Sequence, residues 1–90
     1  MKKLSKDYIL RTIAGEKVVV PTGNTVQRFN GLITLNDVAG FIWECLENND
    51  TKEEIVQKIL EEYEVEEATA VQDVNGFTQI LEEQGILVEE

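Results

Sequence analysis

The chain has 90 residues, 42% hydrophobic and 29% charged, which is typical of one small domain covering residues 1–90. It contains no His and a single Cys. Its composition therefore excludes His-based acid–base catalysis, Ser-His and Cys-His nucleophile pairs, His- or Cys-rich zinc sites, and iron–sulfur or disulfide frameworks. The formal net charge of −10 disfavours binding to nucleic acid and to anionic membrane surfaces.

The charge is divided unevenly along the chain. Residues 1–35 hold six Lys or Arg and two acidic residues, a net +4, whereas residues 36–90 hold two Lys and sixteen acidic residues, a net −14. The acidic part is either the solvated surface of helices or a charge boundary that orients a partner. Because no signal peptide or membrane span is evident and the lone Cys suits a reducing compartment, we expect a cytoplasmic protein.

The first third of the chain is predicted to form strands. Tyr8–Ile13 and Lys17–Val20 are rich in β-branched or aromatic residues, and a short Gly-containing turn between them predicts a hairpin. Thr25–Phe29 is a third β-prone run, and Gly31–Leu35 is the last extended piece. The Asn30-Gly31 pair between them is either a hairpin turn or a bulge within one bent strand.

Three helices are expected after these strands. Asn36 is a good N-cap for the first helix, which has apolar residues on two sides and is therefore expected at the centre of the core. These residues are Val38, Ala39, Phe41, Ile42, Trp43, Cys45 and Leu46. Thr51 and Glu54 form a capping box that begins a second helix, which runs to about Tyr63.

A third helix is expected from about Glu67 to Glu83, with Gly85 as the residue that ends it. Ile86–Val88 then packs or pairs with the rest of the domain. Strands followed by helices predict an α+β domain, with a three-stranded antiparallel sheet followed by three helices in a winged-helix-like arrangement.

The third helix has one apolar face and two flanks. The apolar face, expected in the core, consists of Ala70, Val74, Phe77 and Leu81. One flank consists of Val71, Asn75 and Thr78, and the other of Asp73 and Ile80. Gly76 lies nearly opposite the apolar face, where a glycine costs about 1 kcal/mol relative to alanine. It either allows another molecule to approach closely or has no function.

No catalytic group is evident in the sequence. Paired acidic residues such as Glu53-Glu54 and Glu82-Glu83 fall on polar helix faces, whereas a general acid needs burial to raise its pKa. Cys45 has no basic neighbour in sequence and lies on an apolar face, so an inert core thiol is expected. Motifs for calcium and phosphate loops are absent. The sequence therefore predicts no enzyme activity, no metal site and no cofactor.

A winged helix often binds DNA, which makes a transcription regulator an alternative. The third helix would enter the major groove, yet it has no Lys or Arg and contains Asp73, Glu82 and Glu83. Because phosphate contacts supply most of the binding energy of such modules, nucleic acid is not expected as a partner. A permanent structural subunit of an enzyme is a further alternative.

A three-stranded sheet leaves at least one edge strand without a partner. An extended peptide can add to such an edge, with main-chain hydrogen bonds giving affinity and side-chain pockets giving selectivity. If the third helix lies beside Gly31–Leu35, an apolar groove forms between them. Its walls would be Leu32, Ile33, Val71, Val74 and Thr78. Alternatively, the chain's own termini cover this surface.

Several stretches of the chain together form a recognisable pattern. In the first half they are Tyr8-x-Leu10-Arg11-x-Ile13-Ala14-Gly15-Glu16-x-Val18-Val19-Val20-Pro21-x-Gly23 and Phe29-Asn30-Gly31-Leu32-Ile33-x-Leu35-Asn36. In the second half they are Ala39-x-x-Ile42-Trp43, Thr51-x-Glu53-Glu54-Ile55, Asp73-Val74-x-x-Phe77 and Leu81-x-x-x-Gly85-Ile86-Leu87. Together they cover nearly the whole chain, and they resemble the PqqD family (pyrroloquinoline quinone biosynthesis protein D).

The resemblance implies a peptide-recognition function. Members of the family bind the leader segment of a ribosomally synthesised precursor peptide as an added strand, beside the third strand and against the third helix. They present it to a modifying enzyme, often a radical S-adenosylmethionine protein. For this chain the resemblance implies a non-catalytic adaptor in natural product biosynthesis, with the Val71 side of the third helix chosen as the groove wall. The implied peptide-binding residues are Gly31, Leu32, Ile33, Thr34, Val71, Val74, Asn75 and Thr78.

Overall fold

The computed structural model describes residues 2–22 and 33–89. The expected strand Thr25–Phe29 and the Asn30-Gly31 pair lie outside these residues, as do Gly31 and Leu32 of the expected site.

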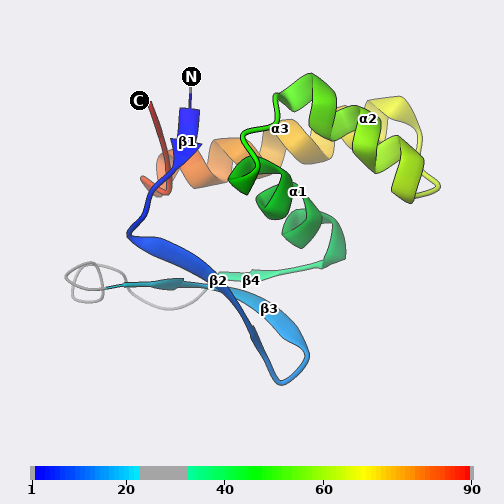
Figure 1. Ribbon diagram of the computed structural model, residues 1–90. Helices are drawn as coiled ribbons and strands as arrows, with labels where there is room; N and C mark the ends of the chain where they lie inside the picture. Colours follow the sequence, from blue (N-terminus) through cyan, green and yellow to red (C-terminus); the bar gives the residue numbers. More distant parts are fainter. Residues whose placement is uncertain (1, 23–32, 90) are drawn as a thin grey trace.

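The described strands form two separate sheets (Figure 1). The strands are β1 (Lys2–Leu4), β2 (Tyr8–Ile13), β3 (Glu16–Pro21), β4 (Ile33–Leu35) and β5 (Leu87–Glu89). An antiparallel three-stranded sheet has the order β2-β3-β4, and β1 pairs antiparallel with β5 in a two-stranded sheet. The three-stranded sheet and the three helices after it confirm the expected α+β fold.

The predicted hairpin is formed by β2 and β3, which extend away from the helices (Figure 1). Ala14 and Gly15 lie at its tip, between the paired residues Ile13 and Glu16. Both tip residues have positive φ, 53° and 83°. Two such residues in a row make the turn whose twist matches that of the flanking strands, so the turn fixes the register of the hairpin.

The pairing of β1 with β5 was not predicted, although Ile86–Val88 was expected to pack or pair. Leu4 lies opposite Leu87, and Lys2 lies opposite Glu89. The Lys2 ammonium also forms an ion pair with Glu82, with Nζ and Oε2 2.8 Å apart. A strand of three residues, two of them lysines, has too little alternation to be recognised from sequence.

The three helices have the predicted starts. They are α1 (Asp37–Glu47), α2 (Lys52–Glu62) and α3 (Glu67–Glu83). At the start of α1, the Ala39 amide donates to Asn36 Oδ1 at 2.8 Å. At the start of α2, the Glu54 amide donates to Thr51 Oγ1 at 3.1 Å, and the Thr51 amide donates to Glu54 Oε1 at 2.9 Å. This reciprocal pair confirms the capping box.

Gly85, two residues after the end of α3, terminates the helix as predicted and has a φ of 72°. The Gly85 amide donates to the Glu82 carbonyl at 3.1 Å, and the Ile86 amide donates to the Leu81 carbonyl at 2.8 Å. These two bonds form a Schellman motif, in which a left-handed residue satisfies the last carbonyls of a helix. The buried side chains of Leu81 and Ile86 belong to one core cluster, so the motif returns the chain to β5.

Helix α1 lies at the centre of the core, as its two apolar sides predicted. Ile42 and Cys45 belong to a buried cluster with residues of α2 and α3. Trp43 belongs to a second cluster with Val19 of β3 and Leu35 of β4. Both Ile42 and Trp43 are only 1% exposed. One helix therefore holds the sheet and the other two helices together.

Cys45 is a core thiol, as expected. Its residue is 4% exposed, and burial, followed by the nearby Asp50 carboxylate, raises the pKa of the Cys45 thiol. Asp50 itself is paired with the Lys58 ammonium. A thiol whose pKa is raised stays protonated at neutral pH and is a poor nucleophile.

Replacing Thr51 by alanine should remove one half of the capping box. We expect Thr51→Ala to lower the free energy of unfolding by about 1 kcal/mol and the melting temperature by about 4–8 °C. Gln57→Ala, at an exposed position of α2, is the matched control. Equal melting temperatures for the two variants in thermal unfolding followed by circular dichroism would contradict the role of the cap.

The Cys45 thiol should be protected from alkylating reagents in the folded protein. We expect little modification by iodoacetamide at pH 8 under native conditions, and rapid modification in denaturant, because reaction requires an exposed thiolate. Mass spectrometry of timed samples measures both rates. Similar rates in the two conditions would show that the thiol is accessible in the native state.

Candidate functional site

Strand β4 is an edge strand of the three-stranded sheet. On one side it pairs with β3, with Leu35 opposite Lys17 and Ile33 opposite Val19. No other strand among residues 2–22 and 33–89 pairs with it. The terminal strands pair with each other, so the described parts of the termini do not cover this edge as strands. An edge of this kind can accept an additional strand.

The side chains of β4 alternate between the two faces of the sheet. Leu35 is 7% exposed and Ile33 packs against the same core cluster, so both face the helices. Thr34 is exposed and faces the other way. A strand added beside β4 would alternate in the same manner, with every second side chain directed toward the helices.

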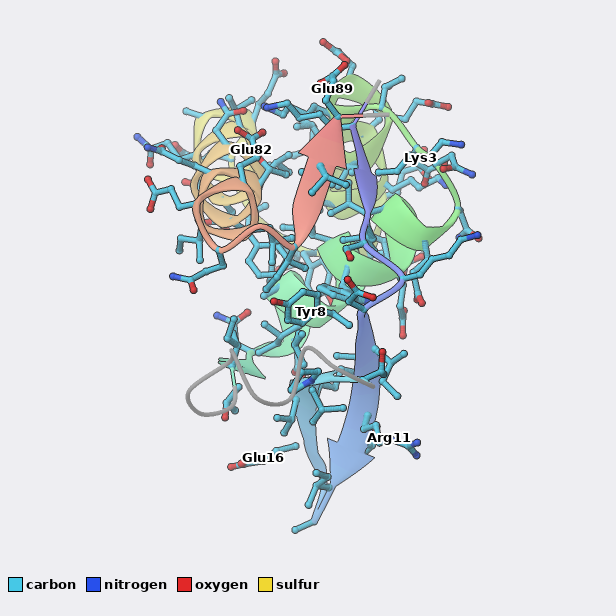
Figure 2. The ribbon with its side chains drawn as sticks, turned by 90° about the vertical axis from the view of Figure 1, so that its left-hand side faces the viewer. Lys3, Tyr8, Arg11, Glu16, Glu82 and Glu89 are labelled. Carbon is cyan, nitrogen blue, oxygen red and sulfur yellow. The ribbon has the colours of Figure 1, made fainter. Side chains whose placement is uncertain are left out.

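Helix α3 lies on the same side of the molecule as β4 (Figure 2). Phe77 and Leu81 of α3 pack in the core cluster that includes Leu35 and receives Ile33. A hollow of about 310 Å³ lies where β4 passes into α1. Its lining comes from the start of α1 (Asn36, Val38, Ala39 and Ile42) and from α3 (Gln72, Asp73, Gly76, Phe77 and Ile80).

The lining of this hollow mixes apolar and polar side chains. Ile80 is 50% exposed, which makes it a large apolar side chain that the described residues leave half uncovered. Asp73 is the one charged residue in the lining. An extended segment that runs along β4 and past Asn36, the residue after the strand, would therefore meet both apolar side chains and a carboxylate.

The other residues expected in the site fall in two further places. Val74 and Thr78 are buried, and the Thr78 hydroxyl donates to the Val74 carbonyl at 2.8 Å. Val71 and Asn75 line a second hollow, of about 280 Å³, together with residues of α2. The structure thus brings Ile33 and Thr34 to the β4 edge, but it places Val71 and Asn75 on the flank of α3 that faces α2.

The flank of α3 beside the start of α1 was not chosen from sequence. It consists of Asp73, Gly76 and Ile80. The sequence signal for it was Ile80, an apolar residue outside the core face. Which flank faces α2 depends on how α2 and α3 pack, and the spacing within one helix cannot show that.

Among the described residues, no group of three or more His, Cys, Asp or Glu is placed to hold a metal ion. Within the same part of the chain, no helix is long and apolar enough to cross a membrane. Helix α3 has no basic residue to contact phosphates.

Two solved structures share this fold over almost the whole chain. One is TbiB1 in complex with the TbiA(beta) leader peptide, with a TM-score of 0.79, 28% sequence identity, and coverage of 98% of this chain and 96% of that one. The other is lasso peptide synthetase B1 complexed with the leader peptide, with a TM-score of 0.80 and coverage of 98% of both chains. At 23% identity, the second shows similarity of fold alone.

Comparison with curated proteins finds no match in sequence. A family model does match: coenzyme PQQ synthesis protein D (PqqD) aligns with residues 16–87. This range includes β3, β4 and all three helices, so it contains both walls of the hollow. The match confirms the resemblance found in the sequence, and the chain belongs to the PqqD family.

Proposed function

We propose that this protein binds the leader segment of a ribosomally synthesised precursor peptide and presents it to a modifying enzyme. The observation that carries the proposal is the edge of β4, which has no second strand partner among the described residues and leads into Asn36, a residue of the hollow between α1 and α3. The likeness to TbiB1, which binds a leader peptide, supports it.

The strand edge and the hollow each contribute binding energy. Within the described residues β4 covers Ile33–Leu35, and each net hydrogen bond contributes about 0.5–1.5 kcal/mol. A dissociation constant of 1 μM corresponds to about 8 kcal/mol. Main-chain bonds to Ile33–Leu35 therefore supply only part of that energy. Burial of a large apolar side chain contributes about 1.5–3 kcal/mol more, and the hollow provides the place for it.

The flank that includes Ile80 is the better candidate for the second wall of the groove. It faces the junction of β4 and α1, whereas the hollow at Val71 lies between α2 and α3. Val71 is 38% exposed and Ile80 is 50% exposed, so the two residues form a matched pair on opposite flanks. The leader segment is proposed to lie between β4 and Ile80.

The chemistry on the bound peptide is proposed to belong to the partner enzyme. A radical S-adenosylmethionine protein is one class of partner that the family resemblance implies. Because precursor peptides are made on ribosomes, the adaptor is proposed to act in the cytoplasm. The sheltered Cys45 thiol and the absence of a metal-binding cluster among the described residues fit an adaptor without catalysis of its own.

A charge on the proposed wall should weaken binding of the leader. We expect Ile80→Asp to raise the dissociation constant at least tenfold, because it replaces a half-exposed apolar side chain of the hollow by a second carboxylate beside Asp73. Val71→Asp is the matched control and should bind with unchanged affinity. The probe is a labelled synthetic peptide that covers the leader of the precursor encoded beside this gene, titrated by fluorescence anisotropy.

The two variants distinguish the flanks. Weaker binding by Val71→Asp with unchanged binding by Ile80→Asp would place the leader on the α2 side of α3. Absence of saturable binding by the unmodified protein at micromolar concentrations would overturn the proposed function itself.

A further inference from the structure

Gly76 is a glycine that the fold does not explain. It lies in the interior of α3, where glycine is the least favourable residue after proline. Its φ is not positive, in contrast to those of Gly15 and Gly85. A Cβ atom built on Gly76 would meet nothing within 4 Å. Neither the backbone conformation nor the packing therefore excludes alanine at this position.

The position of Gly76 beside the hollow offers a reason for the glycine. It lines the hollow between the start of α1 and α3, together with Val38, Phe77 and Ile80. Its missing side chain thus leaves open space at a position that borders the hollow. Glycine is commonly found where a ligand approaches the backbone closely. Local sequence choices that disfavour the fold are expected at functional sites, where another requirement outweighs them.

We propose that Gly76 sets the width of the hollow and thereby selects leader peptides that carry a bulky apolar side chain next to the residues paired with β4. This inference rests on the proposed function. Asn36, which directly follows β4, lines the same hollow as Gly76, so a guest strand on this edge ends beside it. Val38, Phe77 and Ile80 in the lining favour an apolar side chain, and the absent Cβ leaves room for a large one.

Adding side-chain volume at Gly76 should stabilise the protein and weaken leader binding at the same time. Gly76→Ala should raise the melting temperature by about 4–8 °C, because alanine favours the helix. It should also raise the dissociation constant of the leader probe about tenfold, and Gly76→Leu about a hundredfold, because an inserted side chain overpacks the occupied hollow. Gln79→Leu adds bulk at an exposed position of α3 that lines neither hollow, and it should leave the dissociation constant unchanged.

The guest side chain can be identified with the same leader probe. Each apolar residue of the peptide is replaced by alanine in turn, and the peptides are titrated against the unmodified protein and Gly76→Leu. One replacement should weaken binding to the unmodified protein by about tenfold or more. The same replacement should raise the dissociation constant much less with Gly76→Leu, because the leucine side chain already fills the hollow.

Four results would overturn the inference. Unchanged binding by Gly76→Leu together with weak binding by Ile80→Asp would show that the groove stands but that Gly76 does not set its width. A lower melting temperature for Gly76→Ala would show that the glycine serves the fold. Equal losses of affinity for every alanine-substituted peptide, with the unmodified protein and with Gly76→Leu, would show that no leader side chain enters the hollow. Failure of the unmodified protein to bind the leader removes the proposed function and this inference with it.

Discussion

The outer edge of β4 is the constraint on which the rest of the account depends. Backbone amides and carbonyls that leave water need hydrogen-bond partners, so an edge strand beside a hollow favours one kind of guest, an extended chain. The two termini could have supplied that strand, but β1 and β5 pair with each other, between α3 and α1 in the view of Figure 2. Among the described strands, the fold thus keeps its own chain ends away from the edge.

The walls of the groove are held in place by the core. Helix α1 packs against α3 through Ile42 and against the sheet through Trp43. The Lys17 side chain crosses from β3 to α1, where its stem lies so close to Gly40 that a Cβ there would be 2.5 Å from Lys17 Cδ, and its ammonium lies 3.5 Å from Glu44 Oε1. A groove with walls fixed in this way loses little entropy on binding, which favours affinity with a short contact strand.

Local signals predicted most of the fold, whereas the peptide-binding residues chosen from sequence stay a prediction. The capping box at Thr51, the left-handed Gly85 and the apolar spacing of α1 each depend on residues close in sequence, and the structure confirms them. The pairing of the termini and the orientation of the two flanks of α3 depend on contacts between distant elements, which spacing within one segment cannot show. The sequence thus indicated the strand that forms the edge, but the chosen wall was the flank with Val71, which faces α2.

Strand addition can be tested directly by amide hydrogen exchange at β4. The account predicts that amides of Ile33–Leu35 that exchange quickly in the free protein become protected when the leader peptide is added, because their N–H groups then donate to the peptide backbone. Amides at the β1–β5 pair and on the α2 side of α3 should exchange at unchanged rates. Saturable leader binding without any new protection in β4, or with protection confined to α2 and the Val71 flank, would contradict the account.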